Sequence, residues 1–377
     1  MTLALNQANI IQQMHITISK ENLLKGLQSV QGVVGSRSTL PILANVLLRA
    51  EGNLLHFTAT DLDMAITCNV EAKVEIEGTT TLPVKRLFNI VRELSSGDIT
   101  MESNDKHICS VNSGGSRFKI HGISADEFPP SVTLNNAKEV KIDRGVLGDM
   151  LSKTCFAMST DEARYVLNGS FMRFKDNQLT VVATDGRRMA LIKAEVDVPE
   201  ASTGEFIIPA KAVAEIQRTL QEKGEVRICF NDSRASFETE TSSITTKLIE
   251  GQYPNFQQVI PSEARERVGF PREELLGALR RAQIMTTEKF SSVKLAFTKN
   301  NLSITANTPE VGEAKEILVV NHKGGDVAIA FNPRYVIDPL TALKDESVFV
   351  ELIDDLSPAV LKTEGSFLYV VMPMRLS

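Results

Sequence analysis

The most constraining feature of this sequence is a pattern that occurs three times, with intervals of 123 to 126 residues between its landmarks. The Ala-Thr-Asp motif at residues 59–61 returns at 183–185, and a looser Ala-Asn-Thr version stands at 306–308. A proline precedes a helix-like segment at three matching positions, Pro83, Pro209 and Pro333. Independent landmarks that share one interval predict a repeated structural unit. A unit of this length is large enough to be a domain with its own core.

Each copy carries two segments with the periodicity of an amphipathic helix. In residues 83–94, Leu87, Val91 and Leu94 recur at helical spacing, while basic side chains take the other side. The matching segments are residues 20–30, 83–94, 143–158, 209–220, 271–285 and 332–343. Apolar and β-branched segments between them predict strands. Because two helices cannot cover both faces of a large sheet, we predict an α+β fold with the helices on one side.

Polar linkers divide the chain of 377 residues. We predict a flexible N-terminal extension at residues 1–13 and three domains at 14–137, 138–265 and 266–377. Whether the protein starts at Met1 or at Met14 stays open. The first residues lack the basic segment and cleavage site of a signal peptide, and no apolar segment approaches the roughly 20 residues that span a bilayer. We therefore expect a soluble protein of the cytoplasm.

The net charge of −6 argues against a simple basic DNA-binding module, but the charge is unevenly distributed. In and beside the six helical segments there are fifteen Lys and Arg residues and nine Asp and Glu residues. The helices therefore carry +6 and the remainder −12. If the helices all lie on one side, that side is basic and the opposite side is acidic. Ordinary surface helices of mixed charge are the alternative, and composition alone does not decide between the two.

The sequence contains none of the motifs that would indicate an enzyme. It has no P-loop, no GxGxxG after a strand, no GxSxG and no HExxH. Asp61 with Asp63, Asp185, and Asp354 with Asp355 are the carboxylates that a metal site would use, but no His or third carboxylate stands at ligand spacing. The four cysteines form no CxxC pair and are expected to be buried, reduced thiols. We predict no catalysis, no metal and no cofactor.

Four motifs point to one family: TLPIL at 39–43, YVLNG at 165–169, ATDGRR at 183–188 and YVVMPMRL at 369–376. In these, and in order from residue 14 to 377, the chain resembles the bacterial DNA polymerase III beta subunit, the sliding-clamp family. The resemblance implies the DNA clamp fold and a head-to-tail homodimer that closes into a ring of six similar domains. Helices would line the hole, and sequence-independent phosphate contacts would suit a protein that slides on double-stranded DNA. The ring would be a processivity factor associated with the nucleoid.

The resemblance also implies a cleft between the second and third domains that binds short peptide motifs of partner proteins. The partners would be the replicative polymerase alpha-type subunit, the clamp loader, other polymerases, and mismatch-repair or ligase proteins. The implied cleft residues are Leu167, Thr184, Gly186, Arg187, Arg188, Met189, Pro254, Val259, Tyr335, Leu356, Val370, Met372, Pro373, Met374 and Arg375. Adaptable methionines suit one groove with many ligands, and Arg188 and Arg375 suit peptide carbonyls or carboxylates. From the residues alone, an ordinary turn and a final strand would explain these motifs.

This chain departs from the family pattern at several cleft positions. Arg187 stands where a His is familiar, Met189 where a Leu is, Pro358 where a Ser is, and Gln258 where an Arg is. We expect its preferences among partner peptides to differ in detail.

The positions implied for DNA contact are Arg37, Lys85, Arg86, Arg164, Tyr165, Lys211 and Arg218. Val166 and Ala210 replace a Tyr and an Arg that are familiar there, and Asp161 makes its loop acidic. Each cation taken singly has the alternative reading of a solvated surface charge. Their sum carries more weight than any one of them.

The positions implied for the ring interface are Arg117, Phe118, Ile284, Met285, Glu310, Glu313 and Glu316. Phe118 would meet Ile284 and Met285 across the seam, and Arg117 would pair with one of the glutamates. Ile284 and Met285 have the helical spacing of core residues, so a place in the core of their own domain is the alternative. Lys315 weakens the charge complementarity of the acidic segment.

Two rival functions remain at this level. An enzyme is disfavoured by the missing motifs. An adaptor that binds peptides without encircling DNA would use the same cleft, but it has no need of basic helix faces. Charge reversal at Lys85, Arg86 and Arg218 would separate clamp from adaptor, because only a clamp would lose function while keeping its affinity for peptides.

Overall fold

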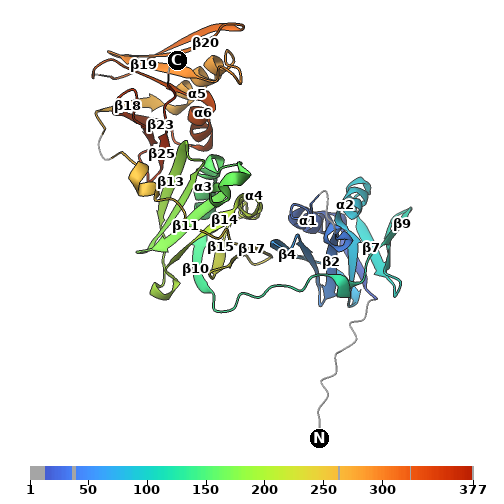
Figure 1. Cartoon of the computed structure of the whole chain (residues 1–377). Helices are drawn as coiled ribbons and strands as arrows, with labels where there is room; N and C mark the ends of the chain where they lie inside the picture. The colour runs from blue at the N-terminus through green and yellow to red at the C-terminus, as the bar shows by residue number, and fades with distance from the viewer. Residues whose placement is uncertain (1–12, 36–39, 262–263, 323, 376–377) are drawn as a thin grey trace. The chain divides into compact units, whose positions relative to one another are not determined.

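The computed structural model describes residues 13–35, 40–261, 264–322 and 324–375 (Figure 1). The chain forms two compact units. The first comprises the described residues up to Glu139 together with Ala214–Lys247, and the second comprises Val140–Val213 together with the described residues from Leu248 onward.

The described part of the chain contains six α-helices, one for each predicted helical segment. They are α1 (Lys20–Val30), α2 (Val84–Glu93), α3 (Arg144–Ser152), α4 (Ala210–Thr219), α5 (Arg272–Gln283) and α6 (Pro333–Ala342). The prediction for α3 was too long, because the helix ends at Ser152 rather than at residue 158. The Thr154 hydroxyl donates to the carbonyl oxygens of Met150 and Leu151, at 2.9 and 3.4 Å. A side chain that bonds the last turn in this way favours its termination.

The strands of the first unit belong to two antiparallel sheets. One sheet has the order β5-β1-β7-β8-β9, and the other contains the run β15-β16-β17-β4-β3-β2-β6. Their bounds are β1 (His15–Ser19), β2 (Asn45–Glu51), β3 (Leu54–Thr60), β4 (Met64–Glu71), β5 (Lys73–Ile76), β6 (Gly78–Pro83), β7 (Asp98–Ser103), β8 (Ile108–Ser113), β9 (Ser116–His121), β15 (Glu225–Phe230), β16 (Arg234–Glu238) and β17 (Ser242–Lys247). Strand β10 (Lys138–Asp143) leads into the second unit.

The second unit has an eight-stranded sheet and a four-stranded sheet. Their orders are β14-β11-β12-β13-β25-β24-β23-β18 and β21-β20-β19-β22. The bounds are β11 (Gly169–Lys175), β12 (Gln178–Thr184), β13 (Arg188–Glu195), β14 (Gly204–Pro209), β18 (Glu266–Pro271), β19 (Val293–Thr298), β20 (Asn301–Thr308), β21 (Gly312–Val319), β22 (Val327–Phe331), β23 (Ser347–Leu352), β24 (Ala359–Lys362) and β25 (Leu368–Val371). The last strand, β25, pairs with β13 from the middle of the chain, and Met189 lies opposite Val370.

In many of the strands, alternating apolar residues bury one face, whereas edge strands such as β9 are mostly exposed. In β1, Ile16 and Ile18 are buried while their neighbours are half-buried. Helix α1 packs on β3 and β4 at a distance that requires Gly26. A Cβ atom on Gly26 would stand 2.5 Å from the Phe57 ring, closer than side-chain carbons pack.

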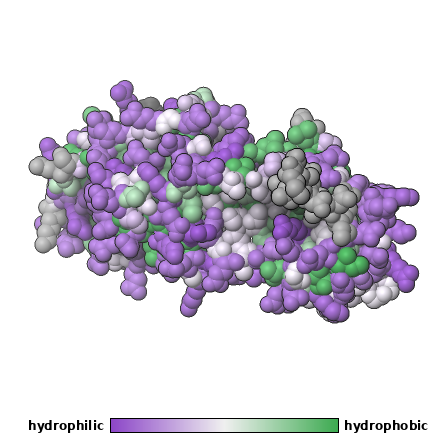
Figure 2. Space-filling view, turned by 90° about the horizontal axis from the view of Figure 1, so that it is seen from below, coloured by the Kyte–Doolittle hydropathy of each residue, from purple (hydrophilic) through white to green (hydrophobic). Residues whose placement is uncertain are grey.

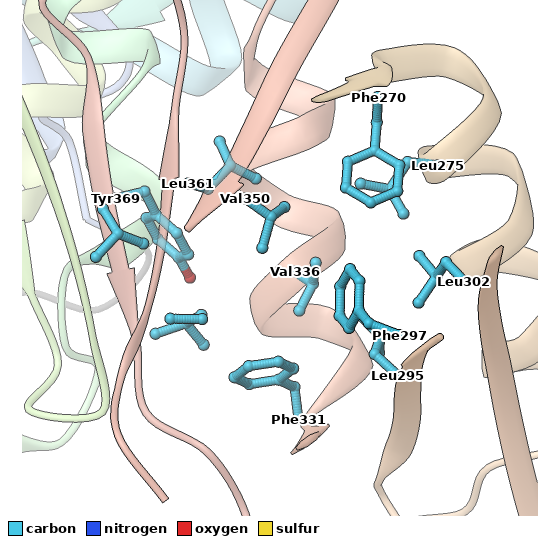
Figure 3. A pocket seen from close by; sticks show the side chains of 13 residues that line it. Phe270, Leu275, Leu295, Phe297, Leu302, Phe331, Val336, Val350, Leu361 and Tyr369 are labelled. Atoms are coloured by element: carbon cyan, nitrogen blue, oxygen red, sulfur yellow. The ribbon is translucent and has the colours of Figure 1, made fainter. Parts of the chain in front are cut away.

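The core of the C-terminal part of the second unit lies between strands and helices α5 and α6 (Figure 3). Phe270 and Phe297 meet edge to face with ring centroids 6.3 Å apart. The cavity that these side chains line has a volume of about 20 Å³ and no polar wall. The Tyr369 hydroxyl at its edge donates to the Tyr335 carbonyl oxygen over 2.6 Å. Because the space is about that of a single water, it is a packing gap in the core and not a ligand site.

The surface shows no large apolar face in the view of Figure 2, in which hydrophilic side chains predominate and hydrophobic ones form small separate groups. Among the described residues, no helix combines the length and the apolar character that crossing a bilayer requires.

Candidate functional site

The candidate site is built on the turn between β12 and β13, in the second unit. Thr184 donates from its hydroxyl to the Arg188 carbonyl over 2.6 Å and accepts from the Gly186 N–H at 3.0 Å. The Asp185 carboxylate oxygen Oδ1 accepts from the backbone N–H of Arg187 at 2.9 Å and of Arg188 at 3.0 Å. Gly186 has φ of +84°, a conformation that favours glycine. Four local hydrogen bonds from the Thr184 hydroxyl and the Asp185 carboxylate therefore fix the conformation of the ATDGRR turn.

Arg188 lies inside the protein at this loop, with only 7% of the residue exposed. Its guanidinium donates to the Asp185 carboxylate at 3.0 Å, to the Asp338 carboxylate at 2.6 Å and to the Phe156 carbonyl at 2.8 Å. The guanidinium carbon also lies 4.6 Å from the centre of the Tyr335 ring.

These partners keep Arg188 charged. Burial by itself lowers the pKa of Arg188, but Tyr369, Asp338 and Asp185 outweigh burial and raise that pKa above its usual value. Since three of its five N–H donors are engaged internally, Arg188 supports the wall of the site. Its predicted direct contact with a peptide stays a prediction.

The end of the chain forms the second wall. After β25, the Met372 N–H donates to the Arg187 carbonyl over 2.9 Å, and the Met374 N–H donates to the Ala330 carbonyl over 2.7 Å. The first bond holds the tail to the ATDGRR loop and the second holds it to β22, and 44% of Met372 and 37% of Met374 remain exposed. The tail thus presents two exposed, polarisable and adaptable side chains, and Met372 is the one bonded to the ATDGRR loop.

An apolar cluster forms the floor. Phe171 stacks on Tyr253 with ring centroids 4.9 Å apart, and Met189 and Val370 are buried with them. Burial raises the pKa of Tyr253, so its hydroxyl stays protonated at neutral pH. Leu167 packs against the cluster from the side and remains half-buried.

Residues of the loop and of α6 also line a polar pocket of about 360 Å³. Arginines and aspartates share its wall with aromatic side chains, among them Arg164, Asp185, Arg187, Arg188, Arg334 and Tyr335. The site therefore joins an apolar floor to a charged pocket, an arrangement that suits an extended ligand with both apolar and polar groups.

All fifteen predicted cleft residues lie in the second unit. Eight are exposed: Gly186, Arg187, Pro254, Val259, Leu356, Met372, Met374 and Arg375. Leu167, Thr184, Tyr335 and Pro373 are half-buried, and Arg188, Met189 and Val370 are buried. Within the described chain, no hydrogen bond links Leu356, in the turn after β23, to the others. Sequence reasoning missed Phe156, Asp338 and Tyr253, because no local pattern places them at this site.

The residues predicted to contact DNA fall in different places. Lys85 and Arg86 are exposed in the first turn of α2, and Lys211 is exposed in the first turn of α4. Tyr165 is 59% exposed, whereas Arg164 lines the charged pocket and donates to the Asp185 carbonyl at 3.1 Å. Arg37 lies outside the described residues.

Arg218 is engaged within the first unit. Its guanidinium bonds the Glu215 carboxylate at 2.9 Å and the Gln28 carbonyl at 3.1 Å. Glu215 itself is buried and lies against Gly32, where a Cβ atom would stand 2.2 Å from its carboxylate. Arg218 therefore holds α4 against the end of α1, and its contact with DNA stays a prediction.

The residues predicted for the interface lie at two sheet ends. Phe118, 37% exposed, and the exposed Arg117 are on β9, the last strand of its sheet. Ile284 caps the end of α5 and is 73% exposed, so it is not part of the core of its own domain. Met285 beside it is half-buried.

The three glutamates predicted for this interface differ in availability. Glu310 and Glu313 are exposed. Glu316 accepts two bonds from the Arg281 guanidinium of its own chain, at 3.0 and 2.6 Å.

No group of three potential metal-ligating side chains occurs among the residues that the structure describes. The carboxylates singled out in the sequence serve the local structure instead. Asp61 accepts from the Asp63 and Met64 N–H groups, and Asp354 from the Leu356 and Ser357 N–H groups.

Three family models match the chain in succession. They describe the N-terminal, central and C-terminal domains of the DNA polymerase III beta subunit, and they match residues 14–134, 141–255 and 257–375. Together they span nearly all of the described chain.

Relatives and solved structures agree with these models. The beta sliding clamp of Chlamydia pneumoniae is 35% identical over 96% of this chain and 99% of its own length, and that of Pseudomonas putida is 34% identical over 96% and 100%. The crystal structure of a sliding clamp from Pseudomonas aeruginosa bound to griselimycin has a TM-score of 0.92 at 34% identity, covering 96% of this chain and all of that one. The clamp of Bacillus subtilis also gives 0.92, at 26% identity, over 97% of this chain and 100% of its own.

Proposed function

This chain belongs to the DNA polymerase III beta subunit family, and we propose that it is a sliding clamp that encircles duplex DNA and tethers the replicative polymerase to it. The observation that carries this function is the match of three beta-subunit domains, in order, between residues 14 and 375. A clamp of this family is a non-catalytic processivity subunit of the polymerase holoenzyme. The protein therefore acts by encircling DNA and by binding other proteins, and a partner protein supplies the energy that loads the ring onto DNA.

We assign the three domains to residues 14–137, 138–265 and 266–377, with residues 1–13 as an extension before them. The ranges of the family models support three domains in this order, and the C-terminal model begins at residue 257, before the second boundary proposed here. Sheets run across them, since β4 of the first domain pairs with β17 of the second, and β13 of the second pairs with β25 of the third. Continuous sheets make adjacent domains stiff relative to each other, which a closed ring requires. The ring works in the cytoplasm, on the DNA of the nucleoid.

The ring closes as a head-to-tail homodimer through two different strand edges. Strand β9 ends the five-stranded sheet and β21 ends the four-stranded sheet, and no described strand pairs with their outer edges. An unpaired edge is a template for pairing with another chain. Because the two edges differ, the contact is heterologous, and two copies close into a ring when the rotation between them is a half-turn.

Side chains beside these edges support the same contact. Phe118 on β9 meets Ile284 and Met285 of the partner, at the end of the helix that packs on β21. Arg117 pairs with Glu310 or Glu313. Glu316 is the least available of the three glutamates, because Arg281 already holds it.

The basic helix ends face the DNA. Lys85 and Arg86 stand in the first turn of α2 and Lys211 in the first turn of α4, where a helix dipole disfavours cations. A role in attracting the phosphates of DNA inside the ring explains why basic residues occupy these positions. Phosphate contacts carry no sequence information, so the ring slides freely and topology provides its retention.

The cleft beside the ATDGRR loop binds peptide segments of partner proteins. These are the replicative polymerase, the clamp loader, other polymerases, and repair or ligase proteins. The apolar floor with exposed Met372 and Met374 supports this assignment, as do clamps of Pseudomonas aeruginosa and Bartonella birtlesii that are bound to the ligand griselimycin.

The proposed function is tested by comparing how long the protein stays on circular DNA and on linear DNA. The protein is loaded by a clamp loader with ATP on nicked circular DNA, free protein is removed in moderate salt, and half of the sample is then linearised. A clamp stays on the circles and leaves the linear DNA through its ends. Equal loss from both forms, dependent only on salt, would mean electrostatic binding without encirclement and would leave a peptide-binding adaptor as the function.

A further inference from the structure

We propose that the charged pocket beside the ATDGRR loop is a carboxylate subsite, in which Arg187, flanked by Arg164 and Arg334, binds an acidic side chain of the partner peptide. This inference rests on the proposed function of the cleft and specifies the chemistry of its ligand. It predicts that this protein selects peptides that carry an acidic residue next to an apolar anchor.

The charges of the pocket carry the argument. Four guanidinium groups, of Arg164, Arg187, Arg188 and Arg334, line the pocket. The carboxylates that line or brace it are those of Asp161, Asp185 and Asp338. The pocket thus has one positive charge more than it has negative charges.

Each of the three aspartates is already engaged. Asp185 accepts from Arg188 and from two backbone N–H groups. Asp338 accepts from Arg188 at 2.6 Å, and the second cation near it, Arg334, is 3.6 Å away and 74% exposed. Asp161 caps its own turn by accepting from the Ala163 N–H at 3.0 Å, and lies 3.7 Å from Arg164.

The positive charge of the Arg187 side chain is the one in the pocket that no carboxylate of the described chain neutralises at close range. Its backbone N–H bonds Asp185 and its carbonyl accepts from Met372. Within the described ranges, no carboxylate lies at ion-pair distance from its side chain. A guanidinium offers donors in a planar fork that matches a carboxylate, so a ligand carboxylate both neutralises the charge and satisfies the donors.

The neighbourhood favours a peptide over a nucleic acid as the source of the anion. The Met372 N–H donates to the carbonyl of Arg187, so an exposed apolar residue is bonded to a residue that lines the pocket. The aromatic side chain of Tyr335 forms part of the same wall. A peptide that places apolar groups on the cleft floor therefore brings its flanking residue to the pocket, whereas a nucleic-acid strand binds where several cations follow its backbone.

The test compares two fluorescent peptides with the full-length protein by anisotropy at low and high salt. Both have the same leucine- and phenylalanine-containing apolar anchor. The acidic peptide has two flanking Glu residues, and the neutral peptide has two Gln residues in their place. The proteins are the unmodified chain, Arg187→Gln, the double variant Arg187→Gln/Arg334→Gln, and Lys175→Gln. Lys175 is exposed at the end of β11, so this last variant removes one positive charge from the same unit outside the pocket.

We expect the unmodified protein to bind the acidic peptide about three- to tenfold more tightly at low salt, the range of a charge-assisted contact at a partly exposed site. Arg187→Gln and the double variant lose this preference, so that the ratio of their affinities for the acidic and the neutral peptide falls to about one whatever the absolute affinities are. Lys175→Gln keeps the preference.

Equal affinity of the unmodified protein for both peptides would overturn the carboxylate subsite and leave the proposed cleft standing. A preference that survives in both Arg187 variants would also overturn it. Failure of both peptides to bind would count against the proposed cleft itself. An oligothymidylate whose binding depends on Arg187, with no difference between the peptides, would assign the pocket to phosphate and overturn the inference.

Discussion

The Arg188 guanidinium and the Asp338 carboxylate form an ion pair of 2.6 Å that ties strand β13 to helix α6. The two residues are 150 positions apart in the chain. Both side chains are largely withdrawn from solvent, with 7% and 23% of their area exposed. The pair therefore joins the two halves of the candidate site, one from the predicted second domain and one from the predicted third domain.

Asp338→Ala should destabilise the second unit by about 3 kcal/mol, because it leaves the buried Arg188 charge without its shortest partner. Arg334→Ala is the matched control. It removes an exposed cation 3.6 Å from the same carboxylate and should cost less than about 1 kcal/mol. Urea unfolding followed by a probe in the second unit measures both variants. Equal losses of stability in the two variants would show that the bond between Asp338 and Arg188 does not stabilise the unit more than the exposed contact with Arg334.

Gly186→Ala should weaken partner-peptide binding and lower the stability by about 1 to 2 kcal/mol. The residue has φ of +84°, which an alanine adopts only with strain. Its Cβ atom would also stand 2.7 Å from the Arg164 guanidinium and displace it. Gly115→Ala, at a glycine with open space around it, is the control for a glycine substitution. Fluorescence anisotropy of a labelled peptide measures the affinity, and thermal unfolding measures the stability. If Gly186→Ala left the affinity for the peptide unchanged, the peptide would bind away from this loop.

The stability of the first unit should fall as the pH rises from about 9 to about 12, in part because of two buried thiols. Burial raises the pKa of Cys68 and of Cys109 to about 12. Above the ordinary thiol pKa near 9 the unfolded chain loses these protons while the folded chain keeps them, so unfolding becomes more favourable. Each thiol contributes a slope of up to about 1.4 kcal/mol per pH unit.

Cys109→Ala isolates this effect from other groups that titrate at high pH. Urea midpoints are measured at pH 8, 9 and 10 for the variant and for the unmodified protein. The variant is less stable at pH 8, since it leaves a small cavity, but its stability should fall less steeply with pH. Parallel curves for the two proteins would show that the Cys109 thiol already ionises in the folded state.

Lys85→Glu/Arg86→Glu should weaken direct binding of duplex DNA and leave peptide binding unchanged. If both side chains contact phosphates, the slope of log affinity against log salt becomes shallower by about 2. Lys175→Glu is the control for a change in net charge, and it should not alter the slope. A duplex affinity unchanged by the double variant would mean that this end of α2 does not face DNA.

Ile284→Lys should weaken the proposed homodimer at least about tenfold, or 1.4 kcal/mol, because it would place a charge in the apolar centre of the proposed seam. Since 73% of Ile284 is exposed in the single chain, the fold of each subunit should keep its thermal midpoint. Val132→Lys, at another exposed apolar residue, controls for surface charge. Sedimentation velocity measures the dimer. A lower thermal midpoint with an unchanged dimer would assign Ile284 to the domain and not to the seam.

The helices and strands were largely readable from local patterns. In α2, Leu87 and Val91 are buried while Lys85 and Arg86 are exposed, as their helical spacing predicted. Such patterns succeed because the side of a helix or strand that meets the core is decided by periodicity. The length of α3 was not readable, since its end depends on how the Thr154 hydroxyl bonds the preceding turn.

The site was readable only in part. The ATDGRR loop and the C-terminal tail were singled out by resemblance, and the structure brings them together through the bond between Met372 and Arg187. The roles of single side chains were not readable. Arg188 turns inward to Asp338, Glu316 is held by Arg281, and Arg218 is held by Glu215, and each of these pairings depends on neighbours in space.

By itself, then, the sequence determined the threefold repeat, the α+β class, the places of the helices and the family, because each rests on local periodicity or on motifs in order along the chain. Only the tertiary structure decided which charged side chains form ion pairs inside the protein and which remain available to bind a ligand. The reason is physical. An ion pair forms between groups a few ångströms apart in space, and Arg188 and Asp338 are brought to 2.6 Å by the pairing of β13 with β25 and the packing of α6 beside them. That pairing leaves Arg187, its neighbour in sequence, free to meet a partner.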